Sequence, residues 1–155
     1  MVDHRDFMRL AIAQARTGLA NGEQPFGTVI ASNNEIVFQT YSQKVALCDP
    51  TAHAETLAVR AASQRLRRTL GDCILYTTCE PCPMCLGAML NAGLKRLVLG
   101  ARLRDLSAVN PVFAFGNYSA ENFAALLAWN LEVTSGILTE ECIELYRQAS
   151  VPLTR

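Results

Sequence analysis

Short apolar strands that alternate with helices constrain the fold of this chain most strongly. Residues 73–77 are a short, nearly continuous apolar run, which is typical of a buried central strand, and strands are also expected over 96–100 and 131–134. Helical segments connect them, over 83–92 and 119–129. Strands joined by helices form parallel pairs with right-handed crossovers, and the helices then cover both faces of the sheet. We therefore expect a three-layer α/β/α sandwich.

The remaining segments add a hairpin and three helices. Residues 26–31 and 35–41 are strand-like and flank Ser32-Asn33-Asn34, which is a hairpin signal. Helices are expected over 3–20, over 51–64 and from Thr139 onward. The expected sheet is five-stranded and mixed, and residues 102–117 are expected to be a loop. The chain has 155 residues and no linker or repeat, so we expect a single domain over 1–155.

Composition limits the partners of this domain. No apolar run approaches the length of a membrane span and the start does not resemble a signal peptide, so we expect a cytoplasmic protein with no membrane partner. The formal net charge is zero, whereas proteins that grip long nucleic acids usually carry a basic surplus. Arg65, Arg67 and Arg68 form the one dense basic cluster. A solvated helix end is favoured over an RNA contact for this cluster, about two to one.

The six cysteines favour metal binding or catalysis over a disulfide framework, because no secretory signal accompanies them. Two short motifs supply a set of zinc ligands. His53 is followed two residues later by Glu55, and Cys82 and Cys85 open the predicted helix 83–92. Three protein ligands and one open position are typical of catalytic zinc. The nearby carboxylate would then carry protons.

Three alternatives remain for these residues. Cys79 can complete a closed Cys₃His zinc site, although such a site leaves Glu55 without a task. An iron–sulfur motif lacks a fourth cysteine in a compatible run. The hypothesis of a Cys–His nucleophile of the cysteine-protease type is weak, because a metal better explains two cysteines at ligand spacing beside one histidine.

The motifs resemble those of the zinc-dependent deaminases of the cytidine deaminase-like superfamily, whose signature is H-x-E followed by P-C-x-x-C. They stand here as His53-Ala54-Glu55 and Pro81-Cys82-Pro83-Met84-Cys85. The longer stretches 49–55 and 78–89 and the triplet 25–27 resemble the branch that holds bacterial guanine deaminases and tRNA adenosine deaminases. The resemblance covers nearly the whole chain.

The resemblance implies a fold, a cofactor and a set of roles. It implies one Zn²⁺ per subunit held by His53, Cys82 and Cys85, with Glu55 as the catalytic proton carrier. Backbone groups of Ala54 and Cys82 would contact the base, with Phe26 close to it. The implied activity is hydrolytic deamination with release of ammonia, and the implied assembly is a homodimer.

The chain departs from its relatives where the substrate ring is expected to bind. An asparagine usually stands 11 residues before the ligand histidine, and this chain has Ser42 there, with Gln43 as a possible substitute. Guanine deaminases can also use an aspartate after the fourth strand. Residues 110–117 contain none, so Asp105 is the nearest candidate.

Three substrate hypotheses follow from these observations. The first is a free nucleobase or related heterocycle, most of all guanine. It is favoured by the sequence of residues 73–89, which resembles that of guanine deaminases, and by the zero net charge. Adenosine in tRNA is the alternative, because residues 133–145 and 100–102 resemble tRNA deaminases. The third hypothesis is a non-catalytic, zinc-stabilised binding domain, against which Glu55 argues.

Overall fold

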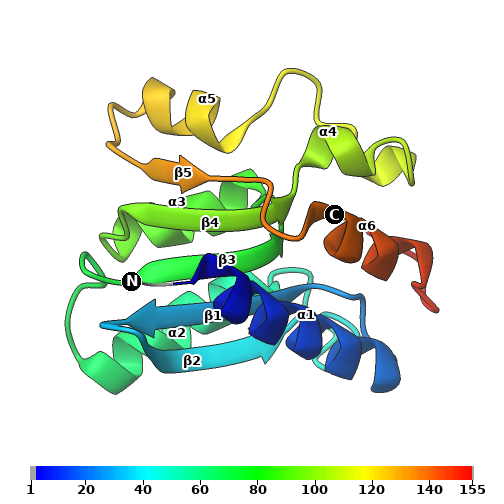
Figure 1. Cartoon of the computed structure of the whole chain (residues 1–155), viewed down its shortest axis with the longest axis horizontal. Helices are drawn as coiled ribbons and strands as arrows, with labels where there is room; N and C mark the ends of the chain where they lie inside the picture. The colour runs from blue at the N-terminus through cyan, green and yellow to red at the C-terminus, as the bar shows by residue number, and fades with distance from the viewer. Residues whose placement is uncertain (1–2, 155) are drawn as a thin grey trace.

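A computed structural model describes residues 3–154 and shows one five-stranded mixed sheet (Figure 1). The strand order is β2-β1-β3-β4-β5. β1 pairs antiparallel with both β2 and β3, whereas β3, β4 and β5 are parallel. The predicted five-stranded mixed sheet and α/β class are confirmed. The strand bounds are Gly27–Ser32 (β1), Glu35–Tyr41 (β2), Ile74–Cys79 (β3), Arg96–Ala101 (β4) and Glu132–Thr134 (β5).

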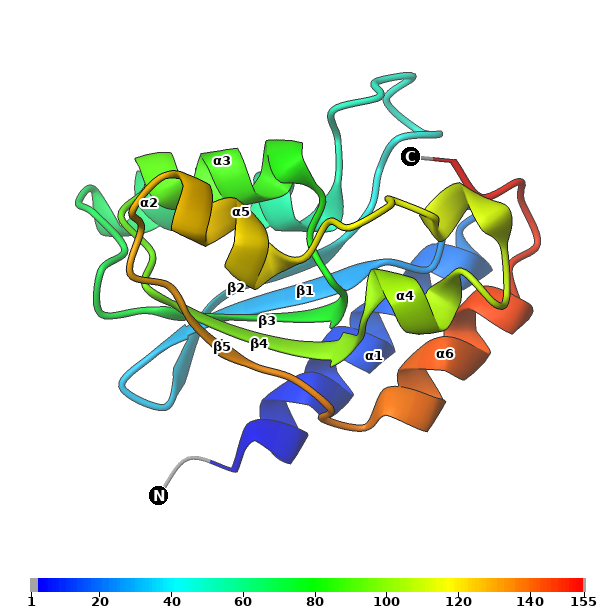
Figure 2. The same cartoon turned by 90° about the horizontal axis from the view of Figure 1, so that it is seen from above.

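Helices cover both faces of the sheet, as Figure 2 shows: α2, α3 and α5 lie on one face, and α1 and α6 on the other. Successive residues of a strand point to opposite faces, so β4 feeds both layers. Leu97 and Leu99 belong to the apolar cluster that includes residues of α2 and α3, whereas Val98 belongs to the cluster that includes residues of α1 and α6. The helix bounds are His4–Ala20 (α1), Ala54–Leu66 (α2), Pro83–Asn91 (α3), Leu103–Leu106 (α4), Ala120–Leu126 (α5) and Thr139–Arg147 (α6).

The start of α2 differs from the prediction by three residues. The Asp49 carboxylate accepts hydrogen bonds from the backbone N–H of Thr51 at 2.8 Å and from its hydroxyl at 2.7 Å. This local turn competes with helix formation, so the helix begins at Ala54 instead of Thr51. His53 becomes the extended N-cap residue, with φ −69° and ψ 150°. Its side chain therefore lies at the mouth of the helix, not on its first turn.

The segment after β4 also differs from the prediction. Residues 102–117 contain the short helix α4 and a 3₁₀ turn, η1, at Pro111–Phe113, where a plain loop was expected. Helix α5 ends at Leu126, not near Trp129, because Ala128 adopts a left-handed φ of 50°. The N–H of Trp129 then bonds the carbonyl of Ala124, which closes the helix end in the manner of a Schellman motif.

Two predictions concern the chain as a whole, namely the lack of a membrane span and the single domain. Over residues 3–154, no helix is both long enough and apolar enough to cross a membrane. The single domain over 1–155 stays a prediction, and residues 1, 2 and 155 lie outside the described part of the chain.

Candidate metal and catalytic site

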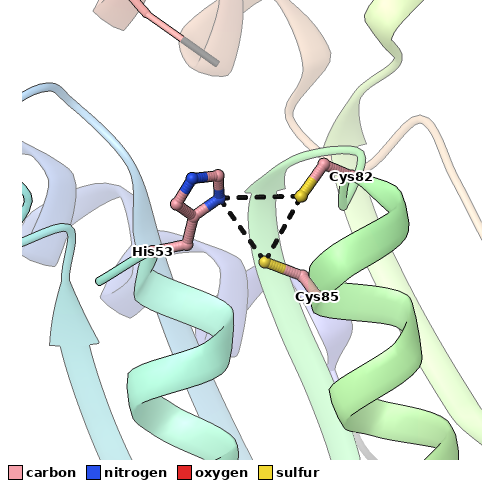
Figure 3. Close-up of side chains that lie close together, drawn as sticks. All are labelled: His53, Cys82 and Cys85. Atoms are coloured by element: carbon pink, nitrogen blue, oxygen red, sulfur yellow. Dashed lines mark hydrogen bonds between the residues drawn. The ribbon is translucent and has the colours of Figure 1, made fainter. Parts of the chain in front are cut away.

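The structure brings the three predicted zinc ligands together at the starts of two helices (Figure 3). His53 is the N-cap of α2, Cys82 is the N-cap of α3, and Cys85 lies in the first turn of α3. The Nδ1 atom of His53 is 3.7 Å from Sγ of Cys82 and 3.5 Å from Sγ of Cys85. The two sulfur atoms are 3.7 Å apart. Residues 29 positions apart in sequence thus form one triangle of donor atoms.

The size of this triangle fits a tetrahedral zinc ion. With Zn–S bonds of about 2.3 Å and Zn–N bonds of about 2.0 Å, two sulfurs of a tetrahedron are about 3.8 Å apart, and a sulfur and a nitrogen about 3.5 Å. The observed separations agree with these values to within about 0.2 Å. One imidazole and two thiol groups are also a donor set that zinc prefers.

One of the two thiols ionises easily. Hydrogen-bonding contacts, first with the Cys85 thiol and then with the His53 ring, outweigh burial and lower the pKa of Cys82 to about 4. The same interaction, together with burial, raises the pKa of Cys85. Helix N-termini also favour thiolates. The site therefore holds a thiolate at neutral pH, which is the form that binds a metal.

Glu55 lies beside these donors and is 4% exposed. One of its carboxylate oxygens accepts a hydrogen bond from the Thr77 hydroxyl at 2.8 Å, and the other lies 3.6 Å from the Cys85 sulfur. Burial raises the pKa of Glu55. A carboxyl group with a raised pKa exchanges protons more readily near neutral pH, so the side chain is suited to carry a proton here.

Cys79 is not part of the donor triangle. Its buried thiol donates to the backbone carbonyl of Glu80 at 3.5 Å, and burial raises its pKa well above the usual range. The described residues that can hold a metal in this region are His53, Cys82 and Cys85. This geometry favours the open site over the closed Cys₃His alternative.

A cavity opens beside the donors, and three of the predicted substrate contacts, Phe26, Ser42 and Cys82, line it. The residues on its wall are Phe26, Ser42, Lys44, His53, Glu55, Cys79, Glu80, Cys82, Leu103, Val112, Phe113, Phe115 and Thr154. Ser42 donates its backbone N–H to the carbonyl of Phe26 at 3.0 Å, which sets the two side by side. The Ser42 hydroxyl is buried and has no hydrogen-bond partner in the structure. It is therefore available to a ligand.

The other two predicted contacts do not line this cavity. Asp105 is exposed, and its carboxylate accepts the backbone N–H of Arg102 at 3.2 Å, which caps α4. Asp105 thus has a local partner at the start of α4, and its contact with a substrate stays a prediction. The Ala54 side chain is fully buried, and the predicted contact, which involves the Ala54 backbone, stays a prediction.

Several wall residues escaped the sequence analysis. Glu80 accepts hydrogen bonds from the backbone N–H groups of Leu103 at 3.0 Å and Ala120 at 2.9 Å, and from the Arg102 guanidinium at 3.2 Å. It thereby ties the starts of α4 and α5 to the end of β3. A charged residue directly after an apolar strand was the available signal. No sequence pattern pointed to Lys44 or Thr154, because the two residues are 110 positions apart in the sequence and only the fold brings them into contact.

Residues 1–101 match the sequence profile of the cytidine and deoxycytidylate deaminase zinc-binding region. The chain belongs to this family. The family binds zinc, and its members are deaminases, which confirms the predicted cofactor and reaction class. The chain is 38% identical over 137 residues to the tRNA-specific adenosine deaminase of Haemophilus influenzae, covering 87% of this chain and 76% of that protein.

The chain is also similar to guanine deaminases. The chain is 42% identical over 106 residues to the guanine deaminase of Bacillus subtilis, covering 67% of this chain and 68% of that protein. A solved guanine deaminase from Nitrosomonas europaea superposes with a TM-score of 0.81 at 25% identity, over 96% of this chain and 85% of that one. The predicted branch is confirmed, and it holds deaminases of both kinds.

Proposed function

We propose that the protein hydrolyses the exocyclic amine of a purine-type ring and releases ammonia, with Zn²⁺ held by His53, Cys82 and Cys85. One observation carries the proposal: a buried carboxylate, Glu55, lies next to one imidazole and two thiol donors, and Glu55, His53 and Cys82 line a cavity. A binding domain that used zinc only for stability would gain nothing from a buried carboxyl group at this place.

Zinc, when bound, supplies a Lewis acid that lowers the pKa of a water molecule in the open position. Glu55 would take a proton from the attacking water and deliver it to a ring nitrogen. It would then carry the second proton of that water to the departing amine. A C–O bond forms and a C–N bond breaks at the same ring carbon, so water and the amine become a carbonyl group and ammonia. Thr77 holds one carboxylate oxygen of Glu55 and leaves the other on the side of the ligands.

The cavity wall suits a flat aromatic ring. Phe26, Phe113 and Phe115 supply apolar surface, and Phe26 is braced by Phe113 at a ring-centroid distance of 6.2 Å. Aromatic faces and edges pack well against planar heterocycles. Ser42 would give the ring one hydrogen bond, where the asparagine of the relatives offers both a donor and an acceptor.

Two substrates remain candidates. Adenosine in tRNA is favoured by the relatives that match most of this chain, and these do not support ranking guanine first. A free base such as guanine is favoured by the zero net charge and by the C-terminal segment, since Thr154 closes part of the cavity. The basic cluster is at the far end of α2, about 18 Å of helix from His53, and Arg68 is paired there with Asp72.

A panel of substrates tests the proposal. Zinc-loaded protein would be incubated with guanine, adenine, adenosine and a tRNA anticodon stem-loop, while ammonia and inosine are measured. Glu55→Gln protein, which keeps the zinc ligands, is the matched control. Release of ammonia from any of these by the unaltered protein and not by the control supports the proposal. Zinc-loaded protein inactive on the whole panel would favour the binding-domain alternative.

We also propose, from the family resemblance alone, that two copies of the chain associate. Sedimentation equilibrium on the zinc-loaded protein tests this, with about twice the 17.0 kDa chain mass expected. A mass of one chain at micromolar concentration would contradict it.

A further inference from the structure

The C-terminal segment of the chain reaches into the cavity and is held there by three hydrogen bonds. The Thr154 hydroxyl accepts from Lys44 Nζ at 2.7 Å and from Gln24 Nε2 at 2.8 Å. The Thr154 backbone N–H donates to Gln24 Oε1 at 3.0 Å. Lys44 and Thr154 both lie on the cavity wall, together with Ser42 and His53.

Two donors therefore converge on a single oxygen atom. Gln24 is 3% exposed, and the orientation of its amide is fixed, because its oxygen must face the Thr154 N–H and its nitrogen then faces the hydroxyl. The Lys44 ammonium group is a donor only and adds a positive charge. An ammonium group and an amide N–H that meet at one point make a place suited to an oxygen acceptor.

The site where Lys44 and Gln24 converge is on the same cavity as Ser42, the residue expected to contact the substrate ring. Lys44 follows Ser42 by two residues, and both side chains reach the same cavity. The Ser42 hydroxyl is buried and lacks a partner, so the wall between Ser42 and Lys44 is polar and incompletely satisfied in the substrate-free protein. Thr154 is the one threonine on this wall, and its hydroxyl accepts a hydrogen bond from Lys44.

We propose that Lys44 and Gln24 form an oxygen-binding subsite, which the Thr154 hydroxyl fills in the substrate-free protein and a carbonyl oxygen of the substrate ring fills in the complex. The inference rests on the proposed function, because it concerns recognition at the same cavity. The subsite makes Lys44 a specificity-determining residue for rings that carry an oxo group. A ring without that oxygen displaces Thr154 and does not replace the hydrogen bonds that Thr154 accepts from Lys44 and Gln24, which costs affinity.

The test is a binding measurement that requires no turnover. Calorimetry would compare hypoxanthine, which carries a ring carbonyl, with purine, which lacks it, on zinc-loaded protein and on Lys44→Met protein. We expect Lys44→Met to weaken hypoxanthine binding about 10-fold and purine binding less than about 2-fold. Lys95→Met, which alters the other lysine of the chain at an exposed position, is the control and should change neither.

A second variant tests the role of the C-terminal segment. Thr154→Val removes the competing oxygen and should tighten hypoxanthine binding about 3-fold, and this gain should vanish in the Lys44→Met background. Equal weakening of hypoxanthine and purine by Lys44→Met would overturn the subsite. So would an effect on inosine 5′-monophosphate that is absent from inosine and hypoxanthine, because Lys44 would then serve a phosphate. Selective hypoxanthine binding without ammonia release would uphold the subsite and refute the proposed function.

Discussion

At the scale of single residues, the site combines groups that a motif fixes with groups that only the fold brings together. His53, Glu55, Cys82 and Cys85 were identified from spacing, because zinc chemistry limits which residues can stand there. Their placement at helix starts followed from the strand–helix order. Thr77 could not be identified in this way, since its hydroxyl reaches Glu55 across 22 residues from the neighbouring strand.

Ser42 allows a prediction in which substrate binding changes while the stability of the folded protein does not. Because its hydroxyl is buried and has no partner, Ser42→Ala should leave the melting temperature unchanged or slightly higher. The loss of one neutral hydrogen bond to the ring should raise KM about 3- to 10-fold. Steady-state kinetics and thermal melting measure both effects. A clear fall in melting temperature with an unchanged KM would contradict the assignment.

Thr77 gives a prediction about turnover. Thr77→Val keeps the shape of the side chain and removes the hydrogen bond that holds the Glu55 carboxylate, so kcat should fall about 10-fold while zinc content stays at one per chain. Thr40→Val, at a buried threonine of β2 that does not contact Glu55, is the control. Equal losses in the two variants would argue against a positioning role for Thr77.

At the scale of elements, the strands and most helices followed from the sequence, whereas their ends did not. The Asp49 turn delays α2 and puts His53 at the N-cap, and the left-handed Ala128 shortens α5. Both are decided by local hydrogen bonds that compete with helix continuation. The helix α4 was missed because four residues show no periodicity, and it exists here with Glu80 as an acceptor for its first N–H.

Glu80 gives a prediction about this connection. Its carboxylate is 2% exposed and accepts from two backbone N–H groups, which Glu80→Ala leaves without their acceptor. The variant also removes one of the two carboxylates that pair with Arg102, while Glu121 remains. We expect a loss of about 3 kcal/mol in the free energy of unfolding, mostly from the two unsatisfied N–H groups. Urea denaturation measures it. Glu144→Ala, which removes an exposed ion pair with Arg147, should cost less than about 1 kcal/mol, and a similar cost for both variants would contradict the account.

At the scale of the whole molecule, the zinc site links two helices on one face of the sheet. The ligands come from the starts of α2 and α3, which follow different strands. A metal that binds only the folded chain stabilises it in proportion to the logarithm of its free concentration over Kd. Removal of zinc by a chelator should therefore lower the melting temperature, and added Zn²⁺ should restore it. A melting temperature that is indifferent to chelation would contradict a site formed by folding.

The most direct test of the account compares zinc content and ammonia release in the unaltered protein and in Glu55→Gln. If His53, Cys82 and Cys85 hold the metal and Glu55 carries the proton, both proteins should contain one zinc per chain. The rate of ammonia release should fall about 10³-fold in the variant. A zinc-loaded Glu55→Gln protein that retains more than about a tenth of the activity would contradict the role of Glu55.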